Sequence, residues 1–135
     1  MRMYGHKDPF PEGTQIFRDT TASAAPVGQF YKGIYHTLIM APVSSNTVAK
    51  CVAGISDSLA TNVFAQAGKC RVPCIYFACD TAPELRSMAP KGMVDVYPRH
   101  IDLENVERLK AFEATLVVDS VVALEEAIME REENV

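Results

Sequence analysis

The feature that most constrains this fold is the alternation of short apolar runs with amphipathic segments. The runs have strand length and lie at Thr37–Met40, Val72–Cys79, Met93–Pro98 and Thr115–Val118. In most of the chain between and after them, apolar residues recur every three or four positions, as on one face of a helix. We expect helices at Val48–Leu59, Asn62–Ala67, Leu103–Phe112 and Val121–Glu130, and a loop with a short helix before Gly92. This order predicts a three-layer α/β fold with a mostly parallel sheet.

The length of 135 residues predicts a single domain over residues 1–135. Residues 1–33, punctuated by proline and glycine, read as an irregular leader with a short helix or strand near Thr14–Arg18. The net charge of −4, without a basic stripe, argues against nucleic acid as a partner. Because the apolar runs are far shorter than a membrane span and no signal peptide is visible, we expect no membrane contact and a cytoplasmic location.

The turn after the first run, Ala41–Lys50, is rich in small polar side chains. Pro42 lacks an N–H and is expected to end the strand. The residues Ser44, Ser45, Asn46 and Thr47 can accept hydrogen bonds from the first free amides of a helix. Helix capping and ligand binding explain them equally well.

A second strand exit, at Ala78, Cys79 and Asp80, adds a thiol and a carboxylate. Parallel strands end at the same edge of a sheet, so both exits can line one crevice. Their hydroxyls, carboxamide and backbone amides suit a planar ligand with carbonyl groups and ring nitrogens. The four cysteines lack the spacing of zinc ligands, so we expect buried thiols and no metal.

Several segments resemble one protein family. Pro42–Thr47 resembles the P-x-S-A-N-T motif of the flavin-containing cysteine decarboxylase superfamily, and Gly54–Leu59 resembles the segment that follows it there. Three further stretches are similar to the branch of archaeal-type flavoproteins and FMN-dependent dihydromethanopterin reductases: Ala25–Phe30, Thr61–Lys69 and Pro98–Val106.

This resemblance implies a flavodoxin-like or Rossmann-like sheet that binds FMN and assembles into a homo-oligomer built from trimers. It implies cofactor contacts at Pro42, Val43, Ser44, Ser45, Asn46, Thr47, Thr61, Asn62, Ala78, Cys79 and Asp80. Asn46 and Cys79 become the candidate catalytic residues, and Pro26, Gly28 and Phe30 belong to a substrate-side loop. The implied activity is electron or hydride transfer to a pterin such as dihydromethanopterin, from a donor such as ferredoxin or a reduced nicotinamide.

Two departures from the family pattern keep alternatives open. Ala78-Cys79-Asp80 stands where the decarboxylases carry a Met-Asn pair, which makes decarboxylation the less favoured activity. The first βα unit, which grips the FMN phosphate in the family, has no counterpart before residue 33, so we expect an N-terminally truncated version of the fold. The alternatives are a phosphopantothenoylcysteine-type decarboxylase and a non-catalytic flavoprotein domain.

Overall fold

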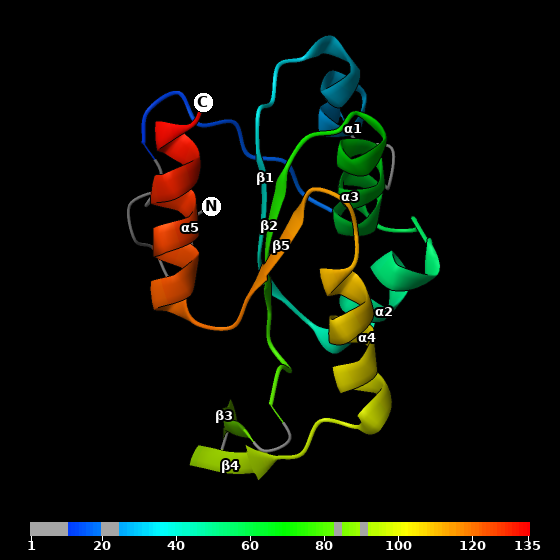
Figure 1. The fold of residues 1–135 in the computed structure, drawn as a ribbon, viewed down its shortest axis with the longest axis vertical. Coiled ribbons are helices and arrows are strands. Elements are labelled where there is room, and N and C mark those ends of the chain that lie inside the picture. The colour runs from blue at the N-terminus through cyan, green and yellow to red at the C-terminus, as the bar shows by residue number, and fades with distance from the viewer. Residues whose placement is uncertain (1–10, 20–24, 83–84, 90–91) are drawn as a thin grey trace.

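The computed structural model describes residues 11–19, 25–82, 85–89 and 92–135. Its main sheet has three parallel strands in the order β1, β2, β5 (Figure 1). The strands are β1 (Leu38–Val43), β2 (Cys74–Ala78) and β5 (Thr115–Val118). Leu38 pairs with Cys74 and Cys74 pairs with Thr115, so the strands begin together. Their carboxyl ends consequently lie at one edge of the sheet.

Helices cover both faces of this sheet and make the three layers expected from the sequence (Figure 1). One face carries α1 (Ala25–Gln29), α2 (Ser45–Ala53), α3 (Leu59–Lys69) and α4 (His100–Lys110). The other face carries α5 (Val121–Glu133). The predicted α/β fold with a parallel sheet is confirmed.

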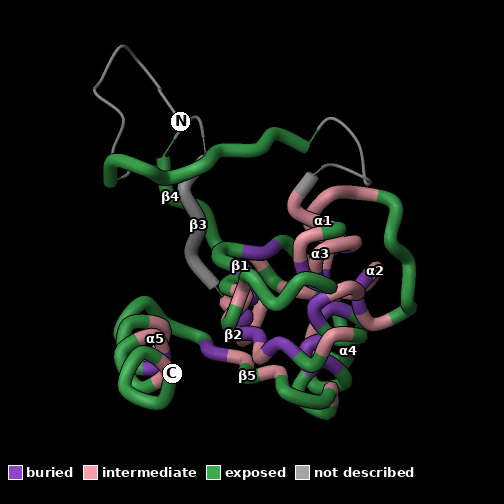
Figure 2. Tube along the Cα trace, turned by 90° about the horizontal axis from the view of Figure 1, so that it is seen from above, coloured by how far each residue is buried: buried purple, intermediate pink, exposed green. Residues whose placement is uncertain are grey.

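The main core lies between β2 and the helices α2, α3 and α4. Tyr76 of β2 has 0% exposed surface, and Leu109 of α4 is equally buried. Phe64 of α3 meets the Tyr76 ring edge-on, with ring centroids 5.6 Å apart. Figure 2 shows the buried positions concentrated in β2 and in the helices beside it.

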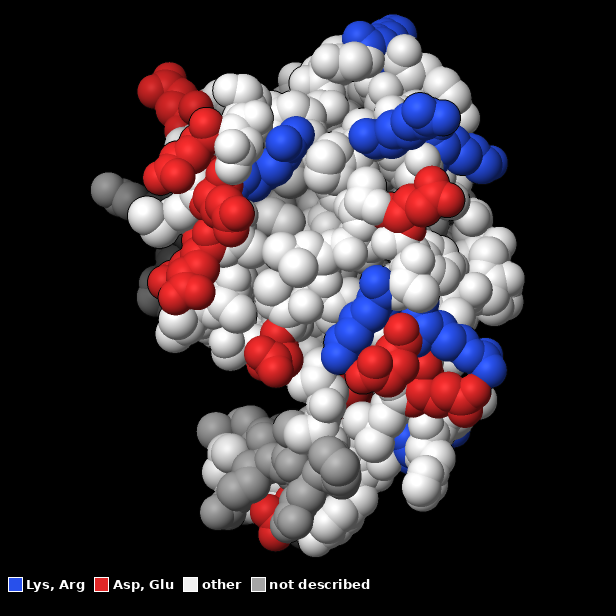
Figure 3. Space-filling view, in the orientation of Figure 1, with Lys and Arg blue, Asp and Glu red and all other residues white. Residues whose placement is uncertain are grey.

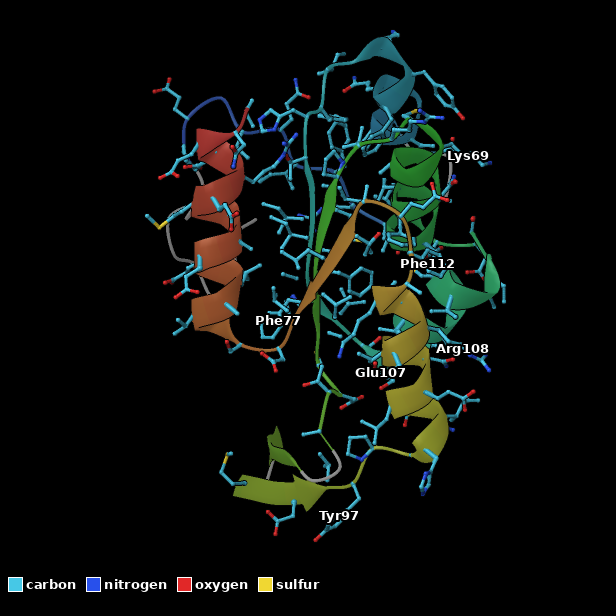
Figure 4. The ribbon with its side chains drawn as sticks, in the orientation of Figure 1. Lys69, Phe77, Tyr97, Glu107, Arg108 and Phe112 are labelled. Atoms are coloured by element: carbon cyan, nitrogen blue, oxygen red, sulfur yellow. The ribbon has the colours of Figure 1, made fainter. Side chains whose placement is uncertain are left out.

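A smaller core joins the other face of the sheet to α5. Ile75 of β2 and Val118 of β5 pack against Ala127. Phe77 projects from β2 toward α5, whereas Phe112 lies on the side of α3 and α4 (Figure 4). The uniformly apolar sequence of β2 therefore fits a strand that is covered on both faces.

The first strand is longer than predicted. It continues through Pro42 to Val43, and its pairing with β2 shifts register between Met40 and Val43. The expectation that Pro42 ends the strand is wrong. β1 lies at the edge of this sheet, where proline and bulges are tolerated because fewer ladder hydrogen bonds depend on each N–H.

The predicted helix Val48–Leu59 covers only the end of α2, which is followed by a non-helical segment at 54–58 and by the first residue of α3. Gly54 ends α2 with a left-handed backbone (φ 78°), and its N–H donates to the carbonyl of Cys51. Ser58 then caps α3, accepting from the N–H of Thr61 at 3.1 Å, so α3 begins before the predicted Asn62. Glycine reaches a left-handed conformation without a steric cost, which explains the break at this position.

Side-chain oxygens accept backbone hydrogen bonds at the start of both later helices. Ser120 caps α5, accepting from the N–H of Ala123 at 3.1 Å. In α4 the helix starts three residues before the predicted Leu103. Asp102 lies in its first turn, where its carboxylate accepts from the N–H of Arg99 at 2.8 Å.

A separate antiparallel hairpin follows β2. Its strands are β3 (Leu85–Ala89) and β4 (Gly92–Val96). The short helix expected before Gly92 is wrong, and the predicted strand Met93–Pro98 belongs to this hairpin rather than to the main sheet. Figure 1 shows the hairpin beyond the carboxyl ends of the parallel strands. Four of the five residues of β4 are exposed, including the apolar Met93 and Val94.

The leader is only partly irregular. No helix or strand forms at 14–18, contrary to the expectation for that segment. Helix α1 and a 3₁₀ turn at Phe30–Lys32 replace the irregular chain expected there. Residues 1–10 and 20–24 lie outside the described residues. The expected loss of the first βα unit concerns this part of the chain and stays a prediction.

Candidate functional site

The two predicted strand exits meet at the carboxyl edge of the sheet. Val43 is aligned with Ala78, and its carbonyl accepts from the N–H of Cys79 at 3.0 Å. One step further along, the hydroxyl of Ser45 donates a hydrogen bond to Oδ2 of Asp80. The two exits are therefore joined by direct contacts, but Ala78, Cys79 and Asp80 do not line the hollow beside the first exit.

A side chain at the start of α2 caps this helix. Ser44 is the N-cap, with an extended backbone (ψ 159°), and its hydroxyl accepts from the N–H of Thr47 at 3.5 Å. That distance is long for a capping bond. The Asn46 side chain is exposed and has no hydrogen-bond partner among the described residues. Capping therefore uses Ser44, and the exposed Asn46 carboxamide takes no part in it.

A hollow of about 400 Å³ lies beside this turn. Pro42, Val43, Ser44 and Thr47 line it together with β1. Ala60 and Val63 of α3 complete the wall. Ligand pockets commonly have volumes of about 300–1,000 Å³, so the hollow can take a ring system. We did not predict Ala60 and Val63, although their spacing of three places both on one face of a helix.

Thr61 and Asn62 lie at the start of α3, in a different environment. Thr61 is buried, and its hydroxyl accepts from the N–H of Ser58 at 3.0 Å. Asn62 accepts from the side chain of Gln66 at 3.3 Å. Neither lines the hollow beside Ser44. The structure thus gives Thr61 a capping role and does not bring it to the other predicted site residues.

Thr61 lines a second cavity of about 500 Å³, between α3 and the ends of α2 and α4. Phe64 and Phe112 form part of its wall, with ring centroids 5.8 Å apart. Lys69 and Glu113 also border the cavity, on the far side from the turn at Ser44. Figure 4 shows Lys69 at the end of α3 and Phe112 after α4.

The predicted substrate-side loop is helical. Pro26 and Gly28 belong to α1, and Phe30 begins the 3₁₀ turn. Phe30 is 5% exposed and packs against Ala67 and Tyr35. The expectation of a loop is wrong because the apolar Phe30 anchors this segment to α3.

Cys79 is the exposed cysteine of the site. Desolvation raises the pKa of its thiol first, and the negative charge of Asp80 raises the pKa further. The neutral thiol is therefore the dominant form near neutral pH.

Cys51 and Cys74 are buried in the core, as predicted. Burial raises the pKa of Cys74 to about 12, so this thiol stays neutral too. In the described part of the chain, no three His, Cys, Asp or Glu side chains are grouped as metal ligands. The helices that the structure describes include none long and apolar enough to cross a membrane.

Residues 2–134 match the Flavoprotein family. The chain belongs to this family. Its parallel sheet with helices on both faces also matches a crystal structure of DmrB from Burkholderia xenovorans in complex with FMN, described as a cubic protein cage for redox transfer. That comparison gives a TM-score of 0.79 and 51% identity, and covers 87% of this chain and 66% of the DmrB chain.

Two curated relatives of this flavoprotein come from Methanocaldococcus jannaschii and Methanosarcina mazei. An uncharacterised protein of Methanocaldococcus jannaschii is 37% identical over 105 residues, which are 76% of this chain and 56% of the relative. A dihydromethanopterin reductase (acceptor) of Methanosarcina mazei is 40% identical over 78 residues, which are 56% of this chain and 33% of the reductase. The chain therefore spans about half the length of the first relative, and it matches 33% of the length of the second.

Proposed function

We propose that this flavoprotein binds FMN and transfers electrons or a hydride to a pterin such as dihydromethanopterin. The observation that carries the proposal is the joining of the two strand exits beside a hollow of about 400 Å³. The FMN bound by DmrB and the reductase name of the archaeal relative support this choice of cofactor and substrate.

The residues of the turn fit a flavin ring. Ser44 and Thr47 border the hollow with hydroxyl groups, and the first amides of α2 point out of the helix start. Such donors and acceptors suit the carbonyl groups and ring nitrogens of an isoalloxazine. When bound, FMN supplies the capacity to accept and pass on electrons, while the protein orients the reactants.

Each site residue has a proposed part in this orientation. Ser44 and Ser45 hold the ring edge, and the unpartnered carboxamide of Asn46 faces the flavin or the pterin. Cys79, kept as a neutral thiol, lies beside the ring and adds no charge to it. Both reactants approach from the solvent-exposed side of the turn Ser44–Thr47. They are the hydride acceptor and the electron donor, which is a molecule such as ferredoxin or a reduced nicotinamide.

The test is a single-turnover experiment on FMN-loaded protein without oxygen. Flavin reduced by dithionite should be reoxidised on mixing with a 7,8-dihydropterin, and tetrahydropterin should form in equal amount. Asn46→Ala should slow this reoxidation while FMN stays bound, whereas Asn134→Ala on the far helix should not. Reoxidation that does not depend on the pterin would contradict the proposal.

A homo-oligomer built from trimers is part of the same proposal. DmrB forms a protein cage, which supports assembly from many copies. The decarboxylase alternative has weaker support, because the matched archaeal relative named above is a reductase and Asp80 stands where a decarboxylase binds a substrate carboxylate.

A further inference from the structure

Asp80 is tied to the N-terminus of α2, which is the most electropositive part of the turn. Ser45, the first residue of this nine-residue helix, donates its hydroxyl to Oδ2 of Asp80. The backbone dipoles of a helix favour a negative charge at that end. The protein's own carboxylate therefore lies near the helix end that would also attract a ligand carboxylate or phosphate.

One oxygen of Asp80 remains open to a ligand. Oδ1 has no donor among the described residues, and within that part of the chain Asp80 forms no ion pair with a lysine or arginine. Its side chain is partly exposed. An ionised carboxylate only accepts hydrogen bonds, and its two oxygens can accept up to about four. Asp80 can thus accept two parallel N–H donors while it keeps the bond from Ser45.

We infer that Asp80 determines which substrates this site accepts, by binding two adjacent N–H groups and rejecting carboxylates. The inference rests on the proposed function. A pterin carries such a pair on its pyrimidine ring, the ring N3–H and the 2-amino group. Two parallel N–H donors on a carboxylate are the geometry of an arginine–carboxylate pair, which is strong and directional. A substrate carboxylate would instead meet a like charge.

Two pteridines that differ in one group test the inference. Pterin (2-amino-4-oxopteridine) presents the donor pair, whereas lumazine (2,4-dioxopteridine) has a carbonyl in place of the amino group. Calorimetric titration of the FMN-loaded protein should show pterin binding at least about tenfold tighter than lumazine, because a lost donor leaves a polar group unpaired. FMN content is measured in every sample first.

Three variants separate specificity from folding. Asp80→Asn keeps an acceptor for Ser45 but can also donate to the lumazine carbonyl, so the preference should shrink to about threefold or less. Ser45→Ala keeps the carboxylate and should keep the preference, even where both affinities fall. Glu126→Gln, which removes an exposed charge of the same sign on α5, should match the wild type.

The outcomes are distinct. Equal binding of both pteridines by the wild type, or an unchanged preference in Asp80→Asn, contradicts the inference and leaves the FMN proposal standing. A shift in FMN affinity or flavin spectrum in Asp80→Asn without a change in preference places Asp80 on the flavin and also contradicts it. A chain that holds no FMN contradicts the proposed function, and the inference with it.

Discussion

At the scale of single residues, the contacts of Asp80 link the charge of the site to the reactivity of its thiol. Asp80 accepts from Ser45 and follows Cys79 directly in the chain. Its negative charge adds to desolvation in raising the pKa of the Cys79 thiol. The same carboxylate therefore shapes ligand choice and reinforces the effect of burial on the neighbouring thiol.

Removal of the Asp80 charge should make Cys79 more reactive at neutral pH. In Asp80→Asn, the pKa of the Cys79 thiol should fall, because only desolvation still opposes the thiolate. The rate of alkylation by iodoacetamide at Cys79, followed by peptide mass spectrometry across pH 7–10, reports the thiolate fraction. Its midpoint should move to lower pH.

Asp57→Asn is the matched control, since Asp57 pairs with Lys50 instead of lying beside a thiol. Its alkylation profile should equal that of the wild type. An unchanged midpoint in Asp80→Asn would show that desolvation alone sets the pKa of Cys79.

At the scale of secondary structure, Gly54 decides where α2 ends. Its φ of 78° lies in the left-handed region, and nothing lies within 4 Å of the place where a Cβ would sit. Gly54→Ala should therefore lower the free energy of unfolding by about 1 kcal/mol through backbone conformation alone. Urea denaturation measures this change.

Gly28→Ala gives the comparison for Gly54→Ala. Gly28 also has open space around its Cβ position but lies in α1 with an ordinary backbone. This substitution should be neutral or slightly stabilising, because alanine favours a helix. Equal effects of the two substitutions would contradict the role given to Gly54.

The local sequence pattern predicted an element correctly where the burial of that element in the fold matches the pattern. The apolar run Val72–Cys79 contains β2, and the predicted helix Val121–Glu130 lies within α5. Pro42 and Gly54 misled the prediction, because a bulge at a sheet edge and a left-handed cap depend on backbone geometry. The hairpin strand Leu85–Ala89 was missed because its pairing with β4 is a tertiary contact.

The site was predictable in part for a similar reason. Polar residues directly after a strand, such as Ser44 and Asp80, identify the carboxyl edge from sequence alone. Ala60 and Val63 reach the hollow only because α3 folds back beside β1, and no local pattern marks them as site residues.

At the scale of the whole molecule, the side of α5 differs from the side of the hairpin in its charge. Figure 3 shows acidic side chains gathered over α5. Exposed apolar side chains lie on β4 and near the start of α4, at Met93, Val94, Tyr97 and Ile101, and α5 adds Val121, Val122 and Met129 among its acidic residues. Two copies would repel each other through α5, so the hairpin side is the better surface for self-association.

The proposed homo-oligomer allows a test of whether the hairpin side, rather than α5, is the surface of self-association. Light scattering after size exclusion should give a mass that is a multiple of three chains of 14.8 kDa. Met93→Asp should shift the protein to smaller species, because it places a charge in an apolar contact. Glu126→Lys on α5 should not. A monomer at micromolar concentration would contradict the oligomer.

Binding of FMN to the purified chain tests the central claim most directly. The flavin fluorescence of FMN should be quenched in a saturable way on titration with the protein, and the loaded protein should be yellow. Ser45→Ala with Asn46→Ala should weaken this binding at least about tenfold, as expected for the loss of two hydrogen-bonding side chains from a ligand site. A colourless protein that leaves the fluorescence of added FMN unchanged would contradict the account.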